Sequence, residues 1–177
     1  ADADIKSYFS FKNSLSDCSD IISKIDLKDL LTCLTNSLMG IGIGKSGLGI
    51  HFNKEIMENQ DLMIGNDIFL EPNGLMEGNG YLIYVMSACS LKKYESIEIL
   101  VQKFGNKIPE DRRDNDNNYA KALICYGKKE YGKSLEHLSR INYDFFNMKH
   151  LVKHIQMMNY YELNDYISFN YVVDSYR

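Results

Sequence analysis

The same order of apolar and polar positions occurs three times in the C-terminal part of the chain. Each copy is a tyrosine followed by side chains three, seven and ten residues later, which lie on one face of an α-helix. The tyrosines are 37 residues (94 to 131) and 35 residues (131 to 166) apart. A period in the mid-thirties is typical of stacked helical hairpins. The three sets are Tyr94, Ile97, Val101 and Phe104; Tyr131, Ser134, Leu138 and Ile141; and Tyr166, Phe169, Val173 and Tyr176.

Each tyrosine also follows a segment whose apolar side chains are three and four residues apart, as in a second amphipathic helix. In an alignment of the copies, Val85, Ala122 and Met157 share one position in this preceding helix. The pattern therefore predicts three helical hairpins. A polar loop over 105–118, with Gly105 as a helix stop, is expected after the first hairpin. The expected helix pairs span 80–91 and 94–105, 117–129 and 131–142, and 147–163 and 165–177.

The N-terminal part has a weaker pattern that glycines interrupt. Five of the ten residues in 40–49 are glycine, a density at which a helix is not expected to persist. We therefore predict an all-α chain with a glycine-interrupted helical part (1–75) and a short α-solenoid of stacked antiparallel hairpins (76–177). The features expected in 1–75 are a polar segment over 1–25 with aromatic residues at Tyr8, Phe9 and Phe11, a helix from its cap Asp26 to Leu38 that Gly40 breaks, a short helix over 50–60, and a turn at Glu71–Gly74.

Composition narrows the classes of function. The 177 residues are 45% hydrophobic and 25% charged with a net charge of −4, as in an ordinary globular protein. No cluster of Lys and Arg suggests a nucleic-acid partner, and the long uncharged stretches, 30–44 and 79–91, are too short to cross a membrane. No signal segment is visible, so a cytoplasmic location is expected. His150 and His154 are spaced as two metal ligands but have no obvious third, so we expect neither metal nor cofactor.

The second copy resembles the tetratricopeptide repeat. In that family the second helix typically opens with Gly-Asp-Tyr and has a small residue three positions later. Here Lys129-Glu130-Tyr131 stands for the opening and Ser134 for the small residue, while Ala122 matches the small residue where the two helices cross. Ile97 and Phe169 replace the small residue in the other copies, which suggests looser packing there or a degenerate repeat. The sequence from Asn118 to Arg177 also looks like that of bacterial proteins of this type. The resemblance implies a groove lined by side chains of the first helices.

The glycine segment offers a nucleotide-binding alternative. Residues 42–47 fit GxGxxG, and Gly44-Lys45-Ser46 matches the end of a P-loop. Phosphate binding needs a strand before such a loop and a helix after it. A helix is expected before this loop, and Gly47-Leu48-Gly49 is not expected to open one after it. On this alternative Gly42, Gly44, Lys45 and Ser46 contact the nucleotide.

An enzyme alternative comes from a second pair of glycines. Gly47-Leu48-Gly49 and Gly78-Asn79-Gly80 each precede an apolar segment, 31 residues apart (47 to 78). This arrangement faintly resembles the glycine turns of lanthionine-synthetase-type helical toroids. Those enzymes hold zinc with two Cys and a His, one Cys lying beside the His, and no Cys–His neighbours occur here. The resemblance therefore implies a fragment without the catalytic lobe.

Our main functional expectation is a scaffold that is not an enzyme and that binds a protein or peptide in the groove between hairpins. The sequence does not identify the partner, the pathway or the oligomeric state. Replacing Tyr119 or Lys121 with alanine is expected to leave helicity intact and to weaken partner capture. The expected contact residues are Tyr84, Tyr119, Lys121, Ile124, Lys128 and His154.

Overall fold

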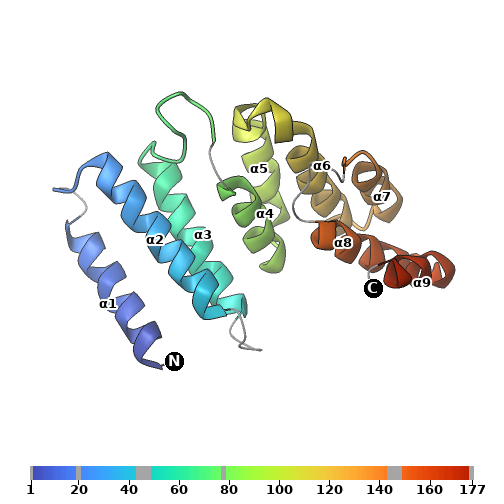
Figure 1. Cartoon of the computed structure of the whole chain (residues 1–177), viewed down its shortest axis with the longest axis horizontal. Helices are drawn as coiled ribbons and strands as arrows, with labels where there is room; N and C mark the ends of the chain where they lie inside the picture. Colours follow the sequence, from blue (N-terminus) through green and yellow to red (C-terminus); the bar gives the residue numbers. More distant parts are fainter. Residues whose placement is uncertain (1, 19–20, 43–48, 77–78, 143–148, 176–177) are drawn as a thin grey trace. The chain divides into compact units, whose positions relative to one another are not determined.

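The protein is all-α, as predicted. The computed structural model describes residues 2–18, 21–42, 49–76, 79–142 and 149–175, and these residues contain no β-strand. The chain divides into two units, Ala1–Gly74 and Leu75–Arg177, and Figure 1 shows successive helices of each unit running in opposite directions. The described helices are α1 (Asp2–Cys18), α2 (Lys24–Gly42), α3 (Gly49–Gly65), α4 (Gly80–Ser90), α5 (Tyr94–Phe104), the short 3₁₀ helix η1 (Gly105–Lys107), α6 (Glu110–Gly127), α7 (Tyr131–Ser139), α8 (Lys149–Glu162) and α9 (Tyr166–Asp174).

The first unit begins with a helix that the sequence pattern did not reveal. Residues expected only to be polar form α1, in which Tyr8 and Leu15 are buried. Lys12 lies between them on the same face and contacts carboxylates of α3. Because a charged residue occupies one of the three inward positions, the apolar period of α1 is broken in the sequence.

Both predicted ends of α2 were wrong. The Ser23 hydroxyl, and not the Asp26 carboxylate, caps the helix: the Asp26 N–H donates to Ser23 Oγ at 3.2 Å, and Ser23 Oγ donates to Asp26 Oδ2 at 2.6 Å. The first bond is the one that the cap residue makes in a capping box, with Asp26 three residues after the cap, and the second joins the two side chains. At the other end the helix runs through Gly40 to Gly42, because a single glycine weakens a helix by only about 1 kcal/mol.

The turn that ends the first unit was predicted correctly, and the helix before it is longer than expected. The expected helix over 50–60 is α3, which extends to Gly65 and buries Phe52, Ile56 and Met63. The chain then turns at Glu71–Gly74, where the Gly74 N–H donates to the Glu71 carbonyl at 2.8 Å. Gly74 has φ +76°, a conformation that favours glycine.

The second unit consists of three helical hairpins, α4–α5, α6–α7 and α8–α9, and each repeat tyrosine is the first residue of the second helix. The three turns have one geometry. Lys92, Lys129 and Asn164, each two residues before its tyrosine, have φ values of 57°, 62° and 56°. In every turn the next N–H donates to the carbonyl five residues back: Lys93 to Ala88 at 2.8 Å, Glu130 to Cys125 at 2.9 Å and Asp165 to Tyr160 at 2.9 Å. These are Schellman motifs, so the sequence period corresponds to a repeated backbone structure.

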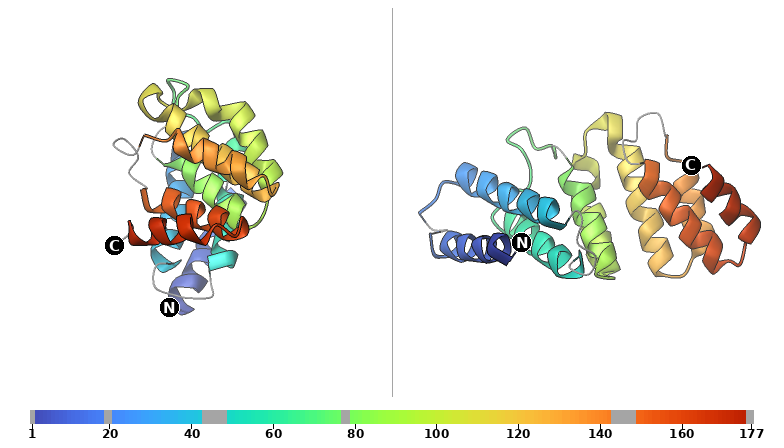
Figure 2. Two further views of the ribbon diagram at one scale, coloured as in Figure 1. Left: turned by 90° about the vertical axis from the view of Figure 1, so that its right-hand side faces the viewer. Right: turned by 60° about the horizontal axis from the view of Figure 1, so that its bottom comes forward.

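Tyr94 and Tyr131 each contact the hairpin that follows their own. Tyr131 lies 5.7 Å from Tyr126, between ring centroids, and its hydroxyl donates to Glu162 Oε2 at 3.3 Å. At the preceding junction the Tyr94 ring covers Gly127, where an added Cβ would lie 2.4 Å from the ring. Gly127 and Glu162 occupy equivalent positions, four residues before the next tyrosine. The tyrosines therefore join successive hairpins, and Figure 2 shows these hairpins from two further directions.

The predicted small-residue position lies at a crossing of three helices. Ser134 on α7 is fully buried, and its hydroxyl donates to the Ala122 carbonyl on α6 at 2.8 Å. Asn159 on α8 donates to the same hydroxyl at 2.9 Å, which links the second hairpin to the third. The corresponding Ile97 is also fully buried, so the looser packing expected there is absent.

The expected loop over 105–118 is mostly helix. η1 ends at Lys107, and α6 begins at Glu110, directly after Pro109. The Asn and Asp side chains that suggested a loop instead bond to neighbouring elements: Asn115 exchanges hydrogen bonds with the Asn142 backbone, and Asn117 donates to the Gly105 carbonyl at 2.9 Å. Gly105 is not a left-handed stop; its φ is −59°, and an added Cβ would lie 2.7 Å from Asn117 Oδ1.

Candidate functional site

An apolar pocket opens beside α8 in the second unit. Its volume is about 370 Å³, and all but one of its lining residues come from the first helices of the second and third hairpins. Met157, Met158 and three aromatic rings supply the apolar surface, while His154 and Glu162 supply charge or hydrogen bonds. The lining residues are Tyr126 on α6, His154, Met157, Met158, Tyr161 and Glu162 on α8, and Phe169 on α9.

The repeat explains why space remains at this junction. Position 119 in the second hairpin is a tyrosine, which is buried near Cys89 of the first hairpin. The equivalent residue of the third hairpin is His154, which is exposed and lines the pocket together with Tyr126, the equivalent of Cys89. When the second and third hairpins are aligned, the pocket therefore corresponds to the space that the Tyr119 ring fills in the second hairpin.

Larger residues at the helix crossing also contribute to the pocket. Val85 and Ile97 in the first hairpin, and Ala122 and Ser134 in the second, are fully buried. Their equivalents, Met157 and Phe169, are half-buried and line the pocket. The looser packing suggested by Phe169 therefore occurs in the third hairpin, and it leaves flexible and aromatic side chains accessible to a ligand.

Glu162 brings charge and a hydrogen bond to the pocket lining. Glu162 accepts a hydrogen bond from Tyr131, and burial, followed by the Glu162 carboxylate, raises the pKa of Tyr126. Both tyrosines therefore keep their hydroxyl protons at neutral pH. The lining has no Ser or Cys nucleophile beside a base, so the arrangement suits binding of an apolar group with a polar or cationic neighbour near Glu162.

The residues expected to contact a partner fall into two groups. Tyr84, Tyr119 and Ile124 are buried, with exposed fractions of 6%, 2% and 9%, and contribute to the core of the second unit. Lys121, Lys128 and His154 are exposed, and the Lys128 ammonium pairs with Glu98 of the first hairpin. Of the expected residues, His154 lies in the pocket.

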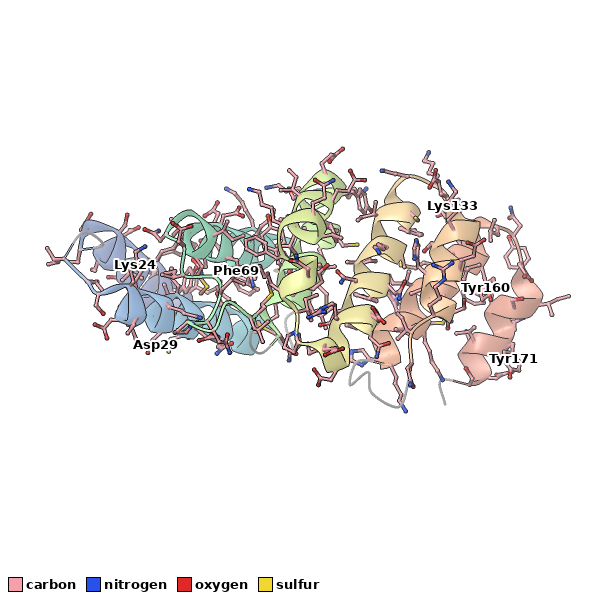
Figure 3. The ribbon with its side chains drawn as sticks, turned by 90° about the horizontal axis from the view of Figure 1, so that it is seen from above. Lys24, Asp29, Phe69, Lys133, Tyr160 and Tyr171 are labelled. Carbon is pink, nitrogen blue, oxygen red and sulfur yellow. The ribbon has the colours of Figure 1, made fainter. Side chains whose placement is uncertain are left out.

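Other pocket residues lie at positions where the sequence predicts the core. The apolar spacing of three and four residues in the first helices predicts Met157 and Tyr161 inside and Met158 at the surface, but Tyr161 is 60% exposed. The useful sequence signal was the change from Ala122 to Met157 and from Ser134 to Phe169 at positions where the second hairpin has small residues. Figure 3 labels Tyr160 on α8 and Tyr171 on α9 in this hairpin.

The glycine segment lies mainly outside the described residues. Gly44, Lys45 and Ser46 are not described, while Gly42 is the last residue of α2. The element before these residues is the helix α2 and not the strand that a phosphate-binding loop requires. The expectation that no helix opens after it was wrong, because α3 begins at Gly49.

Comparisons with protein-family models, curated proteins and solved structures gave no match for this chain. Within the part that the structure describes, no group of three His, Cys, Asp or Glu side chains could hold a metal ion. None of the described helices has both the length and the apolar character needed to cross a membrane.

Proposed function

We propose that the second unit is a tetratricopeptide-like binding module that holds a peptide segment or helix of a partner protein. The observation that carries the proposal is the pocket of about 370 Å³ beside α8, which could take one apolar anchor side chain. Protein interfaces commonly depend on a few anchors buried in such pockets. On this proposal the chain acts as a scaffold and not as an enzyme.

The repeated backbone supports the tetratricopeptide-like part of the proposal. Three hairpins share one turn geometry, and successive hairpins are joined by the same tyrosine position. A surface built from the first helices can then vary while the second helices keep the packing constant. Lys121, Lys128 and His154 are the exposed residues of the predicted contact set, and they belong to this variable surface.

Selection of peptides from a random displayed library on the whole chain tests the proposal. We expect enriched peptides with a large apolar residue next to a basic one, because the pocket is apolar and Glu162 is part of its lining. Met158→Glu, which adds a second carboxylate to the lining, should reduce their affinity at least about tenfold.

Tyr171→Ala is the matched control, because Tyr171 is 77% exposed and does not line the pocket. Binding should be unchanged in this variant. Failure to enrich any peptide, or equal binding by Met158→Glu with unchanged circular dichroism, would rule out the pocket as the binding site.

A further inference from the structure

In the first unit, long side chains of α1 reach across to α3. The Tyr8 hydroxyl lies 3.5 Å from Glu55 Oε2, and Asn59 Nδ2 donates to that hydroxyl at 3.2 Å. One turn later, the Lys12 ammonium bonds Glu55 at 2.5 Å and Glu58 at 2.9 Å. The spacing of four residues places Tyr8 and Lys12 on one row of α1.

The third residue of that row has a much shorter side chain than Tyr8 and Lys12. Ser16 follows Lys12 by four residues, and a cavity of about 240 Å³ lies beside it. Leu15, Leu27 and Leu31 are buried and form the apolar part of the lining with Leu62 of α3. A longer side chain at position 16 would extend into this cavity. The other lining residues are Lys12, Asn13, Ser16 and Asn66.

The polar part of the lining favours a neutral ligand. Lys12 bonds Glu55 and Glu58, and Glu58 also pairs with Lys54 at 3.5 Å, so the charges of these four residues balance. A ligand carboxylate would find no unpaired cation in this group and would lose its hydration on binding. Asn13, Ser16 and Asn66 can instead exchange hydrogen bonds with a hydroxyl or amide. The volume exceeds that of a leucine-lined cavity of about 150 Å³ that accepts benzene, so a ligand of about ten non-hydrogen atoms fits.

We propose that this cavity of the first unit is a binding site for a small, uncharged amphiphile with a medium-length alkyl chain and a hydroxyl or amide head group. The alkyl chain fills the space among the four leucines, and the head group bonds the Asn and Ser side chains at the rim. Because the cavity is lined by α1, α2 and α3, the ligand holds α1 against the other two helices. This site is independent of the peptide site proposed for the second unit.

Binding of 1-octanol to the whole chain tests the proposal, with octanoate as the charged probe of the same chain length. Two-dimensional NMR should show saturable shifts of the Leu15 and Leu31 signals by 1-octanol below about 1 mM, and at least about tenfold weaker binding of octanoate. At 1-octanol ten times its Kd, exchange of the α1 amides through opening of α1 should slow about tenfold. No saturable shift, equal binding of octanoate or unchanged exchange would overturn the proposal.

Two pairs of variants locate the ligand. Ser16→Phe fills the cavity and should abolish the 1-octanol shifts, whereas Ser14→Phe, on the same helix but outside the lining, should retain them. Leu62→Trp narrows the cavity from α3 and should weaken binding even if Ser16→Phe does not fold. Its control is Ile25→Trp, at an aliphatic residue that is 74% exposed and outside the lining. Parental binding by folded Ser16→Phe or by Leu62→Trp would contradict the assignment.

Discussion

Replacing Ser134 with alanine is expected to destabilise the second unit by about 1–2 kcal/mol. The change removes two buried hydrogen bonds, from the Ser134 hydroxyl to the Ala122 carbonyl and from Asn159 to the Ser134 hydroxyl. Each is worth about 1 kcal/mol net, and alanine returns about 0.5 kcal/mol through its higher helix propensity. Asn159 retains its bond to the Ile155 carbonyl at 2.8 Å, which limits the loss.

A double-mutant cycle separates this relay from a general loss of packing. Asn159→Leu removes the other polar partner, including an Oδ1 that accepts no hydrogen bond from the described residues. Because two apolar partners can replace a buried polar pair at little cost, Ser134→Ala should be less destabilising in the Asn159→Leu background. We expect a coupling energy of about 1 kcal/mol.

Urea and thermal unfolding, followed by circular dichroism and tyrosine fluorescence, measure the effect. The expected drop in Tm is about 3–6 °C for Ser134→Ala. Ser139→Ala is the matched control, because Ser139 is an exposed serine on the same helix. Parental stability of Ser134→Ala, or effects of the two changes that add within about 0.3 kcal/mol, would refute a relay that joins the hairpins.

Three further changes test other parts of the second unit. Tyr119→Ala removes a buried ring and should lower the free energy of unfolding, measured with urea, by about 3–5 kcal/mol. Lys121→Ala, at an exposed residue, should change this free energy by no more than about 0.5 kcal/mol. Equal effects of the two changes would contradict the burial of Tyr119. Gly127→Ala places a Cβ against the Tyr94 ring and should lower the free energy of unfolding by about 1–3 kcal/mol. In the Tyr94→Ala background this loss should be smaller. If the effects of the two changes add, the clash is excluded. Burial, followed by nearby cations, lowers the pKa of His137, so its contribution to stability is present above the unfolded pKa of about 6.5 and is lost as pH falls through the lower folded value. The fall in Tm below pH 6.5 should be smaller in His137→Gln, and an unchanged pH profile would contradict this.

The repeat could be read from the sequence because its three copies share one local structure. The tyrosine that begins each second helix follows a left-handed residue and a Schellman turn, and this geometry repeats whatever lies on the variable surface. The fold of the first unit was less visible. Lys12 interrupts the apolar face of α1. Gly40 does not end α2, because tertiary packing of Leu27, Leu31, Leu34 and Leu38 stabilises that helix.

The pocket was only partly predictable, because a cavity depends on the combined sizes of residues far apart in the sequence. His154 was selected from its place on the first helix of its hairpin, and Phe169 was recognised as too large for a tight crossing. The sequence alone did not show that Tyr119 is buried while its equivalent His154 is exposed, because this difference depends on how whole hairpins pack. The polar residues of 110–118 misled for a related reason, since tertiary hydrogen bonds hold them in a helix.

The most direct test of the proposed binding module is methyl NMR of the chain labelled at its 8 methionines, titrated with a peptide selected on it. Met157 and Met158 line the pocket, while Met39 and Met63 lie in the first unit. We predict saturable shifts of the Met157 and Met158 signals, with the Met39 and Met63 signals unchanged. Saturable binding that leaves the Met157 and Met158 signals in place would contradict the assignment of the pocket as the peptide site.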